Sequence, residues 1–216
     1  MSDGIRILLV DDQELIRLGY RLVLEAEADM QVVGEAADGA EAVRAAVELQ
    51  PDVVLMDVRM PVMDGIAATA QIIERAPAAH ILVLTTFDLD EYAFGALEAG
   101  ASGFLLKDAT RDQLTRAVRA VHRGDAMLAP RATRLLIDTF AAGPERRSPQ
   151  PLPQLTDREH DVFVAVGRGL TNAEIAASLF LSESTVKTHI GRILTKLDAR
   201  DRVQLVILAH RAGLVD

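Results

Sequence analysis

The chain of 216 residues contains no cysteine, so neither a disulfide nor a thiolate metal site can hold the fold together. This absence favours a reducing compartment, and we expect a cytoplasmic protein. Long hydrophobic runs are also missing. The apolar start at Ile5–Val10 runs directly into Asp11 and Asp12, and no stretch approaches the roughly 20 apolar residues of a membrane-spanning helix. We therefore expect no signal peptide and no membrane contact.

The charge of the chain is unevenly placed. The net charge is -9, and half of the residues are hydrophobic, which excludes global disorder. Residues 1–124 hold 21 acidic and 11 basic side chains, whereas residues 154–216 hold eight of each. The acidic total argues against a protein that coats nucleic acid with its whole surface. The neutral C-terminal segment can still carry one basic face.

The first 124 residues alternate short apolar runs with longer amphipathic segments, which predicts a parallel α/β sheet. The expected strands are Ile5–Val10, Gln31–Ala37, Asp52–Asp57, Ile81–Thr85 and Gly103–Leu106. The expected helices are Glu14–Ala26, Ala40–Leu49, Gly65–Arg75, Leu89–Ala99 and Thr110–Arg123. In such a sheet, functional groups gather at the carboxyl ends of the strands.

A second, helical domain follows a proline-rich stretch. Residues 141–153 include four prolines, so we assign 1–124 to one domain, 125–153 to a helix and linker, and 154–216 to another domain. Four helices are expected in the last segment, and no strand pattern appears there. Their start signals are Thr156 with Glu159, Thr171 with Glu174, Ser182, and Asp201. A short break at Phe180 and Leu181 gives the spacing of a helix-turn-helix.

Five side chains are expected to meet at one rim of the sheet. They are Asp11, Asp12, Asp57, Thr85 and Lys107, which end or directly follow four of the strands. Three carboxylates repel one another unless a hard cation binds, and Mg²⁺ suits carboxylates, water and a phosphoryl oxygen. Carboxylate, metal, hydroxyl and ammonium together are suited to forming an aspartyl phosphate.

Residues 5–123 resemble the receiver domain of response regulators. The motifs that carry this resemblance are Leu-Val-Asp-Asp at 9–12, Leu-Met-Asp-Val-Arg-Met-Pro-Val-Met-Asp-Gly at 55–65, Val-Leu-Thr at 83–85 and Gly-Ala-Ser-Gly-Phe-Leu-Leu-Lys-Asp at 100–108. The resemblance implies a doubly wound, five-stranded parallel sheet of order 2-1-3-4-5.

The resemblance also implies a role for each site residue. Asp57 would be the phosphoacceptor, Asp12 a direct magnesium ligand, Asp11 a ligand through water, and the carbonyl of Arg59 a further ligand. Lys107 and Thr85 would contact the phosphoryl group. Thr85 and Phe104 would form the switch, although simple core packing of Phe104 is an equal alternative.

The second helix of the helix-turn-helix exposes Lys187, Thr188, Gly191, Arg192 and Lys196 at helical spacing. Such cations and hydroxyls can reach base edges and phosphates in a major groove. A solvated surface is the alternative.

The segment from Leu155 to Leu214 resembles the LuxR-type domain, through motifs at 155–159, 169–176, 181–190 and 196–197. Together with the receiver motifs, this makes the chain similar to the NarL/FixJ class of regulators. Lys187 and Thr188 would face the groove, and Arg192 and Lys196 would lie nearer the phosphates. Ser184 and Thr171 complete the predicted DNA-contacting set.

We therefore predict a transcription regulator, not an enzyme. Its predicted partners are a sensor histidine kinase, double-stranded promoter DNA, RNA polymerase as a candidate, and a second copy when phosphorylated or DNA-bound. The final helix, near Arg202–Arg211, would serve either dimerisation or internal packing.

Two alternatives stay open at this point. One is a magnesium-dependent phosphatase with an aspartyl-phosphate intermediate, although Arg59 stands where a second acid would follow Asp57 by two residues. The other is a regulator that switches by a ligand or protein partner without phosphorylation.

Overall fold

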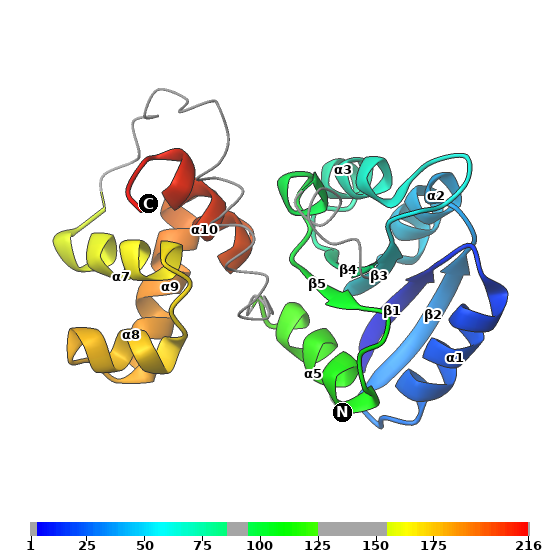
Figure 1. The fold of residues 1–216 in the computed structure, drawn as a ribbon, viewed down its shortest axis with the longest axis horizontal. Helices are drawn as coiled ribbons and strands as arrows, with labels where there is room; N and C mark the ends of the chain where they lie inside the picture. The colour runs from blue at the N-terminus through cyan, green and yellow to red at the C-terminus, as the bar shows by residue number, and fades with distance from the viewer. Residues whose placement is uncertain (1–3, 86–94, 125–154, 216) are drawn as a thin grey trace. The chain divides into compact units, whose positions relative to one another are not determined.

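The computed structural model describes residues 4–85, 95–124 and 155–215 (Figure 1). The chain forms two compact units, residues 1–127 and 128–216, and each is described by itself. The linker predicted for residues 125–153 lies outside the described residues.

The first unit is built on a parallel sheet of five strands. They are β1 (Ile5–Val10), β2 (Met30–Ala36), β3 (Val53–Asp57), β4 (His80–Thr85) and β5 (Gly103–Leu106). Their order is β2-β1-β3-β4-β5, which confirms the predicted topology. β1 and β5 have the predicted bounds, β2 is displaced by one residue at both ends, and β3 and β4 differ from the prediction by one residue at their starts only.

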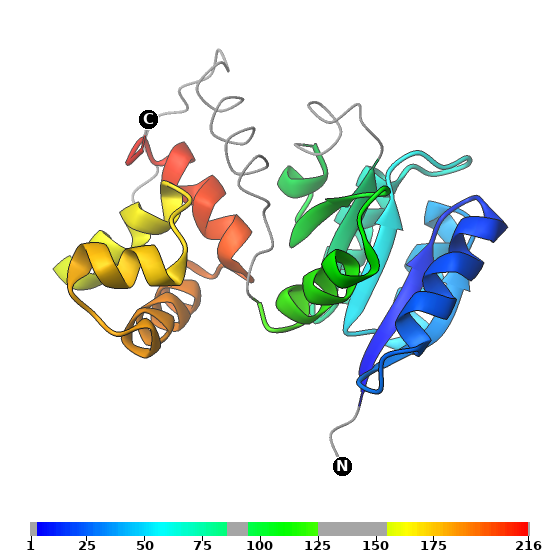
Figure 2. The same cartoon turned by 60° about the horizontal axis from the view of Figure 1, so that its bottom comes forward.

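Helices cover both faces of this sheet. α1 (Glu14–Glu25) and α5 (Arg111–His122) lie on one face, and α2 (Gly39–Leu49) and α3 (Gly65–Arg75) lie on the other (Figures 1 and 2). The helix predicted over Leu89–Ala99 falls mainly outside the described residues, and its described part is helical at residues 95–98.

The core between the sheet and the α1–α5 layer consists of alternate strand residues and one stripe of each helix. Its members include Ile7, Leu9, Leu55, Leu84, Leu24, Leu114 and Val118. Each large apolar side chain that becomes fully buried stabilises the fold by about 1.5–3 kcal/mol.

Helix caps fix where the chain leaves the sheet rim. Asp38 and Asp64 accept hydrogen bonds from the amides of Glu41 and Ala67, so they cap α2 and α3. Thr110 and Gln113 form the predicted capping box of α5.

At the start of α3, a Cβ on Gly65 would lie 2.1 Å from the carbonyl oxygen of Asp57. Glycine is therefore required for α3 to begin directly against the end of β3.

In the second unit, the described residues 155–215 form four helices and no strand. The helices are α7 (Asp157–Gly167), α8 (Asn172–Leu179), α9 (Glu183–Leu197) and α10 (Arg202–Arg211). All four predicted start signals act as caps: Thr156 and Thr171 in capping boxes, and Ser182 and Asp201 by accepting an amide hydrogen bond.

One apolar core joins these four helices. It includes Val162, Phe163, Val166, Ile175, Val186, Ile190, Ile193, Leu205 and Val206. The predicted break falls at Phe180, whose φ of 54° ends α8 in the left-handed region. None of the helices that the structure describes has the length and hydropathy of a membrane span.

Candidate functional site

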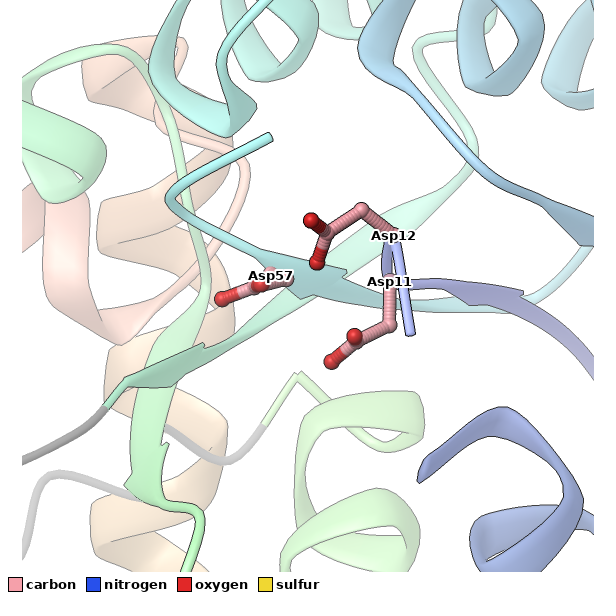
Figure 3. A group of neighbouring side chains, drawn as sticks. All are labelled: Asp11, Asp12 and Asp57. Carbon is pink, nitrogen blue, oxygen red and sulfur yellow. The ribbon is translucent and has the colours of Figure 1, made fainter. Parts of the chain in front are cut away.

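Three carboxylates converge at the carboxyl edge of the sheet (Figure 3). Asp11 and Asp12 follow β1, and Asp57 ends β3, the neighbouring strand. One carboxylate oxygen from each lies within 4.8 Å of those of the other two. Asp11 and Asp57 are buried, whereas Asp12 is exposed. The donor set fits a hard divalent cation reached from the solvent side.

Lys107 joins two of these acids from the loop that follows β5. Its Nζ lies 2.7 Å from Asp11 Oδ2 and 2.9 Å from Asp57 Oδ2. The amide of Lys107 also donates a hydrogen bond to the carbonyl of Thr85, at 2.8 Å. This bond fixes the end of β4 beside the loop that carries the lysine. The structure therefore brings together four of the five predicted rim side chains and holds Thr85 next to them.

One ammonium group cannot neutralise two buried carboxylates, and the pKa directions reflect this. Burial raises the pKa of Asp57 above its ordinary value, and the opposing effect of Lys107 does not cancel it. Burial alone would lower the pKa of Lys107, but its hydrogen bonds to Asp11 and Asp57 outweigh that effect and raise it. The cation is thus well compensated, and the anionic side of the site carries excess negative charge.

The loop between β3 and α3 shapes the other side of the site. The amide of Gly65 donates to the carbonyl of Val58, at 2.8 Å, and closes the loop that contains Arg59. Within it, Val62 has a φ of 66° and is 87% exposed. A β-branched residue rarely adopts this conformation, so the loop is strained next to Asp57. On β5, Phe104 is buried and pairs with Val83 of β4, a position that is compatible with core packing.

Every polar atom of Asp11 takes part in a hydrogen bond. Its two carboxylate oxygens accept from the amide of Gln13 and from Lys107 Nζ, and its amide donates to the carbonyl of Ala36. Its carbonyl accepts from Arg17 Nη1 at 2.7 Å. Sequence reasoning missed Arg17, and the one signal that could have identified it is a basic residue in the first part of a helix.

The helix-turn-helix presents a polar face on α9. The exposed residues Ser184, Lys187, Thr188, Gly191 and Arg192 recur at spacings of three and four, so they share one side of the helix. A Cβ on Gly191 would meet no atom within 4 Å.

Hydroxyl groups near this face already have partners inside the domain. The hydroxyl of Thr188 donates to the carbonyl of Ser184, at 3.0 Å. Thr171 lies at the start of α8, where its hydroxyl forms part of a capping box. A contact between Thr171 and DNA, as predicted, would have to form while the hydroxyl keeps its capping hydrogen bonds.

Lys196 lies at the end of the same face, but its ammonium group is paired inside the domain. Nζ is 2.6 Å from Oε2 of Glu159, a buried residue of α7. The hydrogen bond from Lys196, together with bonds from Thr156, lowers the pKa of Glu159 to about 2. The pair fixes α9 against α7, which is a structural role that the sequence did not predict.

Comparison with known proteins agrees with this geometry. Residues 7–119 match the family described as the response regulator receiver domain, and residues 153–209 match the bacterial regulatory proteins of the luxR family. The transcriptional regulatory protein YxjL of Bacillus subtilis is 45% identical over 99% of both chains. LiaR of the same organism is 43% identical over 98% of this chain and all of its own.

A solved structure covers both domains. The response regulator ChrA of a heme-sensing two-component system is 36% identical over 98% of both chains, with a TM-score of 0.54. The chain therefore belongs to the two-component response regulators of the NarL/LuxR family, and it is a transcription factor with a receiver domain and a LuxR-type helix-turn-helix, not an enzyme.

Proposed function

We propose that a sensor histidine kinase transfers a phosphoryl group to Asp57, and that this transfer controls binding of the C-terminal domain to promoter DNA in the cytoplasm. The observation that carries the proposal is the placement of Asp57 within 4.8 Å of two further carboxylates and 2.9 Å from Lys107. A carboxylate among other acids needs cations around it, and a phosphoryl group brings still more negative charge.

The transfer itself needs little covalent chemistry from the protein. A carboxylate oxygen of Asp57 attacks phosphorus as the bond to the histidine nitrogen of the donor breaks, and the imidazole leaves. Lys107 would neutralise the transferred oxygens, and Thr85 would donate a hydrogen bond to one of them. Asp12, Asp57 and the carbonyl of Arg59 would hold Mg²⁺ directly, and Asp11 would hold it through water. The ion, when bound, would neutralise developing charge on the phosphoryl group.

A protein donor fits the surface beside the site. On α1, Leu15, Leu18 and Leu22 are exposed large apolar residues on one side of the helix, and α1 begins two residues after Asp12. Exposed apolar stripes of this kind mark protein contacts. A kinase that presents its phosphohistidine to Asp57 would cover this end of α1.

On DNA, we propose that Lys187 and Thr188 face the major groove, and that Ser184 and Arg192 contact the groove edge and phosphates. Thr171 at the start of α8 would contact a phosphate. Lys196 is paired with Glu159, so its proposed contribution is mainly to hold α9 in position. Because Gly191 has no side chain, one copy of the domain has few groups for base contacts. This favours binding of two copies to paired half-sites. The DNA-bound dimer could then contact RNA polymerase.

The decisive experiment is selection of bound DNA from a random pool, with and without acetyl phosphate and Mg²⁺. We expect the wild type to enrich a paired half-site with the donor present, and Asp57→Ala to lose the response to the donor. The matched control is Asp112→Ala, which removes an exposed acid from the first turn of α5 and should respond like the wild type.

The outcomes separate the alternatives. If Asp57→Ala responds to the donor as the wild type does, phosphorylation of Asp57 is not the switch. Equal enrichment in all samples, without phosphoryl incorporation, would instead favour switching by a ligand or a protein partner.

A further inference from the structure

Arg17 of α1 forms a hydrogen-bonded bridge between the phosphoacceptor site and β2. Nη1 donates to the carbonyl of Asp11 at 2.7 Å, and Nε donates to Oε2 of Glu35 at 3.0 Å. Its side chain is only 14% exposed. Since the guanidinium group is planar and rigid, holding Glu35 with one nitrogen fixes where the other points.

The contact reaches the site through the backbone. The carbonyl of Asp11 belongs to the peptide group that also contains the amide nitrogen of Asp12, and a peptide group is planar. A bond that fixes this oxygen therefore fixes the plane from which Asp12 leaves. Asp12 is the exposed member of the acid cluster, so its placement depends on its backbone more than on burial.

Arg17 lies near the N-terminus of α1, close to the residues of the acid cluster. Arg17 is the fourth residue of α1, where the helix dipole disfavours a positive charge. Helical side chains point back toward the N-terminus, so from this position the guanidinium group can reach the residues that precede the helix. Arg17 makes its contact with Asp11 from this part of α1.

Charge alone does not account for the arrangement. Arg17 is paired with Glu35, which carries the opposite charge, so we attribute its effect on a cation to the position that it gives the Asp11 carbonyl. Arg21 provides the comparison. It donates to the other oxygen of Glu35 at 2.8 Å and to Glu25 at 2.9 Å, but its bonds do not include Asp11.

We propose that Arg17 is a positioning residue for the divalent-cation site, acting through the Asp11–Asp12 peptide group. The inference rests on the proposed function of the acid cluster. Arg17 does not touch the phosphoryl group, so its loss should change the affinity for Mg²⁺ and leave the maximal extent of phosphorylation unchanged.

The test is a titration of the full, unphosphorylated chain with MgCl₂, followed by NMR of backbone amides around Asp57. Arg17→Met should bind Mg²⁺ about tenfold more weakly than the wild type, the usual scale for removing a group that supports a ligand. Arg21→Met should bind like the wild type. Arg17→Lys keeps the charge, but a single ammonium group cannot hold both the Asp11 carbonyl and Glu35, so this variant should also bind Mg²⁺ more weakly. It replaces Arg17→Met in the test if Arg17→Met does not fold.

A second measurement separates affinity from reactivity. With acetyl phosphate as donor, Arg17→Met should need about tenfold more Mg²⁺ for half-maximal phosphorylation and should reach the wild-type extent at saturation. Unchanged Mg²⁺ affinity in Arg17→Met, wild-type affinity in Arg17→Lys, or an equal loss in Arg21→Met would each overturn the inference. A wild-type protein that neither binds Mg²⁺ nor incorporates phosphate would instead overturn the proposed function.

Discussion

In each domain a lysine is paired with buried carboxylate groups from a distant part of the chain, but the balance of positive and negative charge differs between the two sites. In the receiver, Lys107 is shared between Asp11 and Asp57. In the helix-turn-helix domain, Lys196 is matched with Glu159, whose same oxygen also accepts bonds from Thr156. The first site is left with too much negative charge, and the second is satisfied.

The pKa shifts run in opposite directions for this reason. Burial raises the pKa of Asp57, because one shared lysine does not compensate it. Bonds from Lys196 and Thr156 lower the pKa of Glu159 to about 2. An unbalanced cluster is suited to taking up a metal ion, and a balanced pair is suited to fixing one helix against another. The same residue types thus serve reactivity in one domain and stability in the other.

The largest expected effect comes from breaking the balanced pair with Glu159→Ala. The change removes an acceptor for the amide of Thr156 and leaves Lys196 without its partner, so the domain should lose several degrees in Tm. Hydrogen exchange of α7 and α9 amides would locate the loss. The matched control is Glu174→Ala, which breaks the equivalent capping box of α8 at an exposed residue. An equal loss in both variants would contradict a special role for the Lys196 pair.

The pH dependence of this pair has a defined sign. Because the folded-state pKa of Glu159 is lowered to about 2, its contribution to stability is fully present above the ordinary value of 4.5. It is lost as the pH falls from that value toward 2. The difference in Tm between the wild type and Glu159→Ala should therefore be constant near neutral pH and shrink below pH 4.5.

Asp57→Asn should have the opposite effect on stability. Without divalent cations, it should stabilise the receiver, because it removes a buried charge that Lys107 does not fully compensate and leaves Lys107 paired with Asp11. Since the pKa of Asp57 is raised, its ionised form destabilises the fold at neutral pH, and the advantage of the variant should shrink as the pH falls through the folded pKa. Urea unfolding in EDTA would measure the gain, and saturating Mg²⁺ should remove it. If Asp57→Asn were less stable than the wild type in EDTA, the charge of Asp57 would not be undercompensated in the folded receiver.

The smallest effect is expected at Val62, beside the receiver site. Val62→Gly should stabilise the protein by about 0.5 kcal/mol, since glycine adopts a positive φ freely but loses more chain entropy on folding. Val62→Ala keeps a Cβ in the strained conformation and should recover less. Thermal unfolding of both variants tests this, and equal stabilities would show that φ at this position carries no measurable strain.

The elements of the fold were predictable because local signals mark them. Capping residues such as Thr110, Thr156 and Ser182 place helix starts to the residue. The convergence of Asp11, Asp57 and Lys107 was also predictable, because parallel strands bring their carboxyl ends to one edge. The roles assigned to Thr85, Phe104 and Arg59 stay predictions.

What the sequence did not reveal are contacts between elements. The pairing of Lys196 with Glu159 joins residues 37 positions apart, and a helical pattern reports only that Lys196 lies on the outer side of its own helix. Arg17 likewise reads as an ordinary surface residue until β2 brings Glu35 beside it. Periodicity predicts which side of a helix or strand faces outward, but it does not predict which residue of another element contacts that side.

Gly191 leaves a gap in the row of side chains along α9, and a Cβ added there would have free space around it. A glycine inside a helix costs about 1 kcal/mol relative to alanine, so this position is open to replacement without loss of fold. With α9 in the major groove as we propose, residue 191 is the position at which a long polar side chain could change the promoter preference while the hydrophobic core stays untouched.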